Sequence, residues 1–170
     1  MIIAISGTPG VGKTYIAKKL AKVSDNRLEY FDLNKYIKDN KLYDSYDTKA
    51  DTYDVDVKLL KKIIEPTFRK EYSRDNALDK KIRKTTTISE LTKIISNKKI
   101  DGVIIDSHLS HYLKSDYCII IRADIKILNK RLKERKYSKT KIQDNIESEI
   151  FEVCLDEARK LRRNVIIVEN

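Results

Sequence analysis

The stretch SGTPGVGKTY, residues 6–15, holds three of the four glycines and one of the two prolines in a chain of 170 residues. It follows the apolar run MIIAIS (residues 1–6) and precedes residues 16–23, whose apolar side chains recur at helical spacing. Glycine takes backbone angles that other residues avoid. A buried strand, a tight glycine-rich loop and an amphipathic helix are therefore predicted in this order.

Within this stretch, residues 7–14 (GTPGVGKT) match the pattern G-x-x-x-x-G-K-[ST]. In such a loop, successive N–H groups point inward and form an anion site at the positive end of the following helix. Lys13 is expected to reach the β- and γ-phosphates of ATP, and Thr14 to ligate Mg²⁺. The predicted ATP-binding residues of the loop are Gly7, Gly10, Val11, Gly12, Lys13, Thr14 and Tyr15.

Short apolar runs alternate with helical patterns along the rest of the chain. Most of these runs are apolar throughout, which is typical of strands covered on both faces in a parallel sheet. The predicted strands are residues 1–6, 28–33, 102–106, 117–121 and 164–168. This order predicts a single α/β domain of the P-loop NTPase type over residues 1–170, with a five-stranded parallel sheet flanked by helices and ligands beyond the carboxyl ends of the strands.

Three further helices are predicted from apolar spacing. Residues 59–64 predict a helix before Pro66, and Leu128 with Leu132 marks another. The apolar positions within residues 142–155 predict one long helix.

The net charge of +10 is unevenly distributed. Residues 67–99 contain ten Lys and Arg against four Asp and Glu, a balance of +6, whereas residues 32–56 contain four Lys against seven Asp, a balance of −3. A basic segment is compatible with contact to phosphates or RNA, and equally with a lysine-rich surface that serves solubility or ion-pair networks. Charge alone leaves both interpretations open.

The remaining composition indicates a protein of the cytoplasm. Cys118 lies in an apolar run and Cys154 in a helical pattern, so both are expected as small core residues in a reducing compartment and not as a disulfide. The N-terminus lacks a basic leader, and no apolar run approaches the roughly 20 residues that span a bilayer. Secretion and a membrane partner are therefore disfavoured.

Polar residues follow the third predicted strand. Asp106 ends it, where a carboxylate can hold Mg²⁺ through its water shell, and His108 is close enough to orient an acceptor oxygen or water. A helix N-cap or solvated strand end for Asp106, and an ordinary loop position for His108, are the alternatives. His108 and His111 also have the spacing of a metal pair, but no further cluster completes a tetrahedral zinc site.

Arg131 and Arg135 lie four residues apart on one predicted helix face, just before the polar break KYSKTK (residues 136–141). A guanidinium carried by a closing flap neutralises the charge of a transferring phosphoryl group and helps to expel water. The alternative is a charged helix surface facing solvent.

Five segments in chain order carry a resemblance to a known family. They are GTPGVGKT (7–14), KLYDSYD (41–47), the D-x-H of residues 106–108, RLKERKY (131–137) and DNIESEIFEV (144–153). This combination resembles the small adenylate-kinase-like proteins of the CINAP type, over residues 1–56 and 100–168.

The resemblance implies the fold of a nucleoside monophosphate kinase that uses ATP and Mg²⁺, with AMP or another nucleoside monophosphate as the acceptor. It also implies ATPase activity and a part in small ribosomal subunit maturation and rRNA processing. The implied partners there are a platform ribosomal protein of the S-eleven type and pre-ribosomal RNA.

The resemblance also assigns roles to segments and residues. Residues 32–55 would form the acceptor segment and residues 134–144 the lid, with Arg131 and Arg135 contacting ATP. Thr14 and Asp106 would set the metal, Asp106 through water. The implied catalytic residues are Lys13, Asp106, His108 and Arg135.

The chain departs from this family at four places. Lys136 stands where the family's lid has glycine, and residues 32–55 contain lysines but no arginine, so their phosphate contacts lack the planar guanidinium fork. Residues 67–99 are expected to be an insertion. Relatives continue past the position of Asn170 into a loop that helps to hold the adenine.

Three functions remain open at this point. The first is an adenylate kinase with additional ATPase activity. The second is mainly a ribosome-assembly ATPase, in which the acidic, tyrosine-bearing residues 42–56 mimic RNA toward a basic partner and residues 67–99 contact RNA. The third is a P-loop kinase of another small acceptor.

Overall fold

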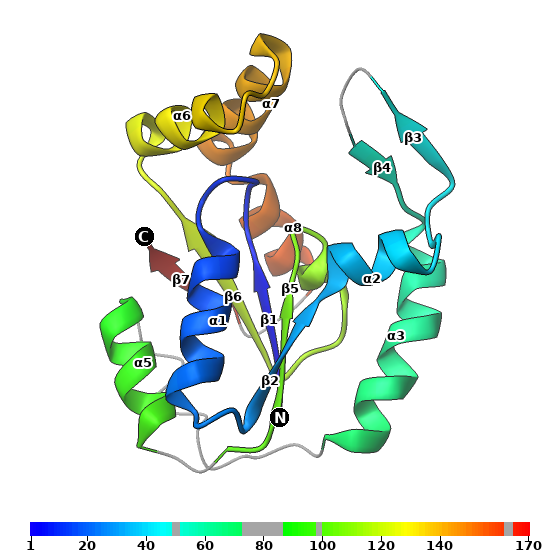
Figure 1. The fold of residues 1–170 in the computed structure, drawn as a ribbon, viewed down its shortest axis with the longest axis vertical. Coiled ribbons are helices and arrows are strands. Elements are labelled where there is room, and N and C mark those ends of the chain that lie inside the picture. Colours follow the sequence, from blue (N-terminus) through cyan, green and yellow to red (C-terminus); the bar gives the residue numbers. More distant parts are fainter. Residues whose placement is uncertain (49–51, 73–86, 98–99, 162–164) are drawn as a thin grey trace.

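The structure, a computed structural model, describes residues 1–48, 52–72, 87–97, 100–161 and 165–170. Five parallel strands form the central sheet in the order β2-β5-β1-β6-β7 (Figure 1). The strands are β1 (Ile2–Ser6), β2 (Leu28–Asp32), β5 (Gly102–Asp106), β6 (Tyr117–Arg122) and β7 (Val165–Glu169). The predicted α/β fold with a five-stranded parallel sheet flanked by helices is confirmed.

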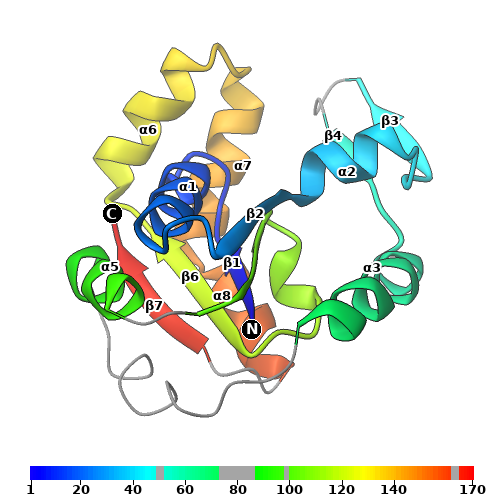
Figure 2. The same cartoon turned by 60° about the horizontal axis from the view of Figure 1, so that its bottom comes forward.

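Helices cover both faces of the sheet (Figure 2). Successive residues of a strand point to opposite faces. Ile3 of β1 therefore packs in one core with α1 and α5, while Ile2 packs in another with α2 and α3. The helices are α1 (Lys13–Val23), α2 (Leu33–Asp39), α3 (Val57–Glu71), α5 (Ile88–Ser96), α6 (Ile125–Glu134), α7 (Lys139–Ile150) and α8 (Val153–Lys160). Burial on both faces explains why β1, β5 and β6 are apolar along most of their length, whereas the edge strand β2 contains Glu29 and Asp32.

The single long helix predicted over residues 142–155 is wrong, because the chain breaks between α7 and α8. Glu152 takes a left-handed conformation with φ 54°, which a helix cannot accommodate. The break frees the carbonyl of Glu149 to accept a hydrogen bond from Arg122 Nη2 at 3.2 Å, and Glu152 pairs with the same guanidinium. This local pairing offsets the cost of leaving the helix.

The helix predicted before Pro66 continues to Glu71. Proline removes one helical N–H but leaves the apolar face intact. Leu60, Ile64 and Phe68 lie at helical spacing on that face and are buried in the core beside β1 and β5. Burial of this face holds the helix together across the proline.

The elements that were not predicted include the helices α2 and α5 and a hairpin of β3 (Ser45–Asp47) and β4 (Thr52–Asp54). Helix α5 lies within the expected insertion, and its Leu91 and Ile95 are fully buried in the core that α1 shares. Residues 73–86 of that segment lie outside the described residues. No helix of the described chain combines the length and the apolar character needed to cross a membrane.

Candidate active site

The glycine-rich loop follows β1 and meets the loop after β5, because the two strands are neighbours in the sheet. Gly7 has φ 137°, and a Cβ there would lie 2.3 Å from the carbonyl oxygen of Ile121 on β6. Gly12 has φ 102° and is the residue from which α1 begins. Only glycine fits both the dihedral angles and the close approach.

Lys13 lies inside this loop with its side chain buried. Its Nζ donates hydrogen bonds to the carbonyl oxygens of Gly7, at 2.8 Å, and Thr8, at 3.0 Å. Burial lowers the pKa of Lys13 to about 8, although the nearby carboxylate of Asp106 acts in the opposite direction. The ammonium group is therefore placed where the phosphates of a nucleotide are expected, and its charge is sensitive to pH.

Asp106 at the end of β5 is 3% exposed and joins three elements. Its Oδ2 accepts hydrogen bonds from Thr14 Oγ1, at 2.6 Å, and from the hydroxyl of Tyr30 on β2, at 3.1 Å. Its Oδ1 is buried without a hydrogen-bond partner among the described residues. An orphaned carboxylate oxygen beside a hydroxyl is a hard oxygen set, so these residues fit Mg²⁺.

Tyr30 is a functional candidate that the sequence analysis missed. Burial raises its pKa, and the carboxylate of Asp106 adds to the shift, so the phenol remains a hydrogen-bond donor across the physiological range. The parallel register pairs Asp32 of β2 with Asp106, which places Tyr30 two residues before the same sheet edge. A comparison of neighbouring strand ends would have found it.

His108 is exposed at the mouth of the site, and its carbonyl oxygen accepts a 2.9 Å hydrogen bond from Ser6 Oγ. The surrounding protein still removes much of the hydration of the imidazole. This desolvation lowers the pKa of His108 to about 4, and the positive charges of Lys13 and His111 act in the same direction. At neutral pH, His108 is a neutral side chain able to donate one hydrogen bond.

His111 is buried, and both of its ring nitrogens are engaged, so it is not available as a second metal ligand beside His108. Its Nδ1 lies 2.8 Å from Ser6 Oγ and its Nε2 lies 3.0 Å from a carboxylate oxygen of Glu157 on α8. Burial lowers the pKa of His111. Across the described ranges there is no group of three or more His, Cys, Asp or Glu side chains placed to hold a metal ion.

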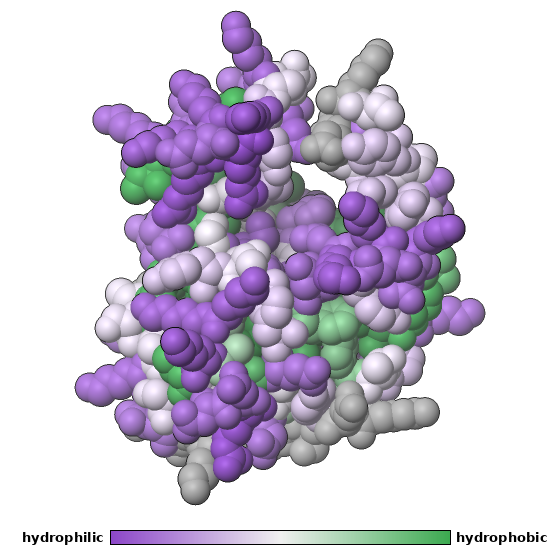
Figure 3. Space-filling view, in the orientation of Figure 1, coloured by the Kyte–Doolittle hydropathy of each residue, from purple (hydrophilic) through white to green (hydrophobic). Residues whose placement is uncertain are grey.

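The predicted acceptor segment, residues 32–55, comprises α2 and the β3–β4 hairpin, with residues 49–51 outside the described part. Asn34 Oδ1 accepts a 2.8 Å hydrogen bond from Ser107 Oγ, which ties α2 to the loop after β5. Figure 3 shows the molecule hollowed between the α6–α7 pair and the β3–β4 hairpin, with hydrophilic residues around the opening. The phosphate loop lies at the base of this opening (Figure 1).

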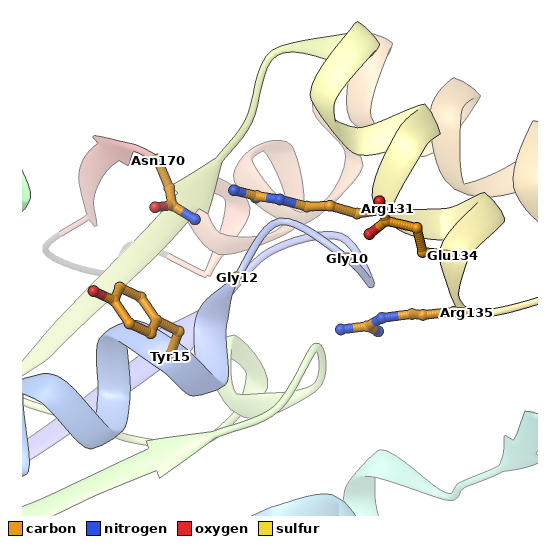
Figure 4. A pocket seen from close by; sticks show the side chains of 7 residues that line it. All are labelled: Gly10, Gly12, Tyr15, Arg131, Glu134, Arg135 and Asn170. Carbon is orange, nitrogen blue, oxygen red and sulfur yellow. The ribbon is translucent and has the colours of Figure 1, made fainter.

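Arg131 and Arg135 of α6 lie on the side of the phosphate loop that is opposite the predicted acceptor segment. Arg131 Nη1 donates a 3.1 Å hydrogen bond to the carbonyl oxygen of Val11, which also accepts one from the side-chain amide of Asn170 at 2.7 Å. Arg135 ends α6, and its side chain extends toward the N-terminal end of α1 (Figure 4). The structure thus brings both arginines to the loop, where Arg131 is already engaged.

A cavity of about 500 Å³ lies outside the loop, between α1 and α6. Tyr15 is 64% exposed at its edge, so an aromatic face is available to a ligand. A Cβ on Gly12 would lie 2.2 Å from the side-chain nitrogen of Asn170. The cavity is lined by Gly10, Gly12, Tyr15, Arg131, Glu134, Arg135 and Asn170.

Comparison with known proteins identifies the family of the chain. The AAA domain family matches residues 3–152. A protein of Methanocaldococcus jannaschii named "Putative adenylate kinase" is 35% identical over 161 residues, which cover 94% of this chain and 72% of the relative. The "Adenylate kinase isoenzyme 6 homolog" of Dictyostelium discoideum is 31% identical over 170 residues, which cover 98% of this chain and 79% of the relative. The chain belongs to the adenylate-kinase-like family of P-loop proteins.

This adenylate-kinase-like assignment confirms the broader part of the predicted resemblance, while the CINAP type stays a prediction. Among solved structures, the shikimate kinase of Bacteroides thetaiotaomicron aligns with a TM-score of 0.46 and 14% identity, covering 100% of this chain and 86% of that one. Several polar residues that make hydrogen bonds in or beside the candidate site were absent from the sequence analysis as candidates. They are Ser6, Thr8, Tyr30, Asn34, Glu149 and Glu157.

Proposed function

We propose that this protein transfers the γ-phosphoryl group of ATP·Mg²⁺ to AMP or another nucleoside monophosphate. The observation that carries the proposal is the carboxylate of Asp106, which accepts a hydrogen bond from the Thr14 hydroxyl at the mouth of the phosphate loop. Its second oxygen has no partner among the residues that the structure describes. The names of the relatives support a monophosphate acceptor.

The donor nucleotide would lie along the phosphate loop. The ammonium group of Lys13 would leave the carbonyls of Gly7 and Thr8 and contact the β- and γ-phosphates. Thr14 and, through water, Asp106 would hold Mg²⁺, which neutralises phosphate charge when it is bound. The base would occupy the cavity beside Tyr15.

The acceptor would enter from the side of α2 and the β3–β4 hairpin. An oxygen of its phosphate forms a bond to the γ-phosphorus as the bond from that phosphorus to the bridging oxygen of ADP breaks, so two nucleoside diphosphates leave. The attacking oxygen already lacks a proton near neutral pH, so no general base is required. His108 orients it by a hydrogen bond, and Arg135 neutralises the transferring group as residues 134–144 close over it.

A coupled assay of ADP formation tests this function. The protein is supplied with ATP and Mg²⁺ together with AMP, with other nucleoside monophosphates, with shikimate, with a nucleoside, or with no acceptor. We expect stimulation by a monophosphate and a loss of at least about 100-fold in Lys13→Ala. Full transfer by Lys13→Ala, or stimulation only by shikimate or the nucleoside, would refute the proposal.

A second candidate is an ATPase of ribosome assembly, and the β3–β4 hairpin favours it. The rings of Tyr43 and Tyr46 pack at a tilt against the ring of Tyr53, with centroids 4.5 and 4.9 Å apart. The two strands of the hairpin also carry Asp47 and Asp54. A negatively charged aromatic surface suits a basic ribosomal protein, while residues 67–99 would contact pre-ribosomal RNA. ADP formation stimulated by a basic ribosomal protein or by RNA, and not by AMP, would favour this candidate over the kinase.

A further inference from the structure

Glu149, near the end of α7, is 4% exposed and its two carboxylate oxygens face different elements. Oε2 accepts a 2.6 Å hydrogen bond from the hydroxyl of Thr8, inside the phosphate loop. Oε1 accepts one from the backbone N–H of Ala123 at 3.2 Å and one from Arg122 Nε at 3.4 Å. A buried carboxylate with this many donors holds its neighbours firmly, because each donor would be costly to leave unpaired.

These contacts lie at the base of the α6–α7 hairpin, defined here as residues 125–150. Ala123 stands just before α6, and Glu149 stands in the last turn of α7. The carboxylate therefore fastens both ends of the hairpin to each other and to Thr8. The hairpin rises above the phosphate loop and carries Arg131 and Arg135 on α6 (Figure 1).

Thr8 connects this clamp to the reacting groups. Its carbonyl oxygen accepts a hydrogen bond from Lys13 Nζ at 3.0 Å, and its hydroxyl is the donor to Glu149. A shift of the hairpin relative to Thr8 would move Arg135 relative to the phosphates. Misplacement of a charged group by about 1 Å is enough to reduce a catalytic rate by up to about 100-fold.

We infer that Glu149 is a positioning residue, which sets the arginines of the α6–α7 hairpin over the phosphate loop through its hydrogen bond with Thr8. This inference rests on the proposed phosphoryl transfer for its kinetic consequence. Glu149 contacts Thr8 and both ends of the hairpin, and it would act through these contacts.

The test compares Thr8→Val, which removes only the hydroxyl donor, with Glu149→Gln, whose single amide oxygen cannot serve both sets of donors. Thr8→Ser restores the hydroxyl. Glu152→Gln is the matched control, because Glu152 pairs with the same Arg122 guanidinium but not with the phosphate loop. For each chain we measure kcat, KM for ATP, and amide hydrogen exchange of α6 and α7 with α1 as the internal reference.

We expect Thr8→Val and Glu149→Gln to lower kcat about 10- to 100-fold, with KM for ATP changed less than about threefold, and to speed exchange in α6 and α7. Thr8→Ser and Glu152→Gln should resemble the wild type. The inference fails if Thr8→Val keeps the wild-type kcat, if its kcat falls without faster exchange in the hairpin, or if Glu152→Gln has the same effect. Exchange needs no turnover, so an inactive wild type would refute the proposed function while the clamp itself was still tested.

Discussion

The hydroxyl of Thr14 lies 2.6 Å from a carboxylate oxygen of Asp106, and the second oxygen of that carboxylate is buried without a hydrogen-bond partner in the described part of the chain. An unpaired buried acceptor is costly, and a bound cation with its water shell would relieve this cost. Binding of the proposed Mg²⁺ at this pair would therefore stabilise the fold.

Asp106→Asn is expected to abolish the additional stabilisation that Mg²⁺ gives to the protein in the presence of ATP. At 100 times Kd, a ligand stabilises a protein by about 2.7 kcal/mol, which for a chain of this size raises Tm by roughly 5–10 °C. The wild type should show this shift and Asp106→Asn should not, as measured by thermal unfolding with ATP and with or without Mg²⁺. Asp101→Asn is the control, because Asp101 is an exposed carboxylate just before the same strand. Equal shifts in Asp106→Asn and the wild type would contradict a metal role.

The activity is expected to fall on the alkaline side because of Lys13. Burial lowers its pKa to about 8, so raising the pH through 8 removes the positive charge in the nucleotide-free protein. Since kcat/KM reports ionisations of the free enzyme, kcat/KM for ATP should fall up to tenfold per pH unit above about pH 8. Lys13→Arg stays charged over this range. Its activity should be lower than that of the wild type, but its kcat/KM should not fall above about pH 8, so its pH profile should lack the alkaline limb. An identical alkaline limb in Lys13→Arg would assign it to another group.

Two glycine substitutions are expected to differ because of what each new methyl group meets. The Cβ of Gly7→Ala would meet the backbone oxygen of Ile121, which cannot move away without distorting β6. The Cβ of Gly12→Ala would meet the end of the Asn170 side chain, which can rotate. Gly7→Ala should lower the free energy of unfolding by about 2–4 kcal/mol and Gly12→Ala by about 1–2 kcal/mol, measured by urea unfolding. A larger loss of stability in Gly12→Ala than in Gly7→Ala would contradict this account of the two close contacts.

The arginines of α6 are expected to affect different kinetic constants. Arg131 bonds the Val11 carbonyl beside the proposed base cavity, so Arg131→Ala should raise KM for ATP about fivefold with little change in kcat. The side chain of Arg135 extends toward the N-terminal end of α1, where it would reach the transferring group, so Arg135→Ala should lower kcat by about 100- to 1000-fold. Steady-state kinetics of the two variants serve as controls for each other. Equal effects on kcat would mean that Arg131 also leaves its carbonyl during turnover.

Lys136 takes the left-handed conformation, with φ 58°, directly after α6. This is where the resembled family has glycine, and a side chain at this φ costs about 1 kcal/mol. Lys136→Gly should raise the free energy of unfolding by about 0.5–1 kcal/mol, whereas Lys136→Ala should not. The free energies of unfolding of the wild type and the two variants are measured by urea unfolding. A gain in both variants would point to the loss of the lysine charge as the cause.

The sequence predicts the sheet well because β1, β5 and β6 are apolar along most of their length, and because even the less buried β2 and β7 contain short apolar runs. The runs at 28–33, 102–106 and 117–121 coincide with β2, β5 and β6 to within a residue. The β3–β4 hairpin was missed because its strands are three residues long and exposed, so no apolar pattern marks them. Helix α2 was missed because it is short, although Asp32 caps its first turn.

The polar side of the candidate site was predictable only in part. Lys13, Thr14 and Asp106 follow from a local pattern and a strand end, and the structure brings them together. The contacts of Glu149 with Thr8, and of Glu157 with His111, join residues 141 and 46 positions apart. No local pattern carries such pairings, because they depend on how the break between α7 and α8 turns the chain toward the sheet.

The loop after β1 surrounds its own cation, since the ammonium group of Lys13 donates hydrogen bonds to the carbonyl oxygens of Gly7 and Thr8. Backbone oxygens thus already solvate the charge that the proposed phosphoryl transfer needs. Binding of a polyphosphate at the proposed site would exchange these carbonyl oxygens for phosphate oxygens, and release of the product would restore the first set.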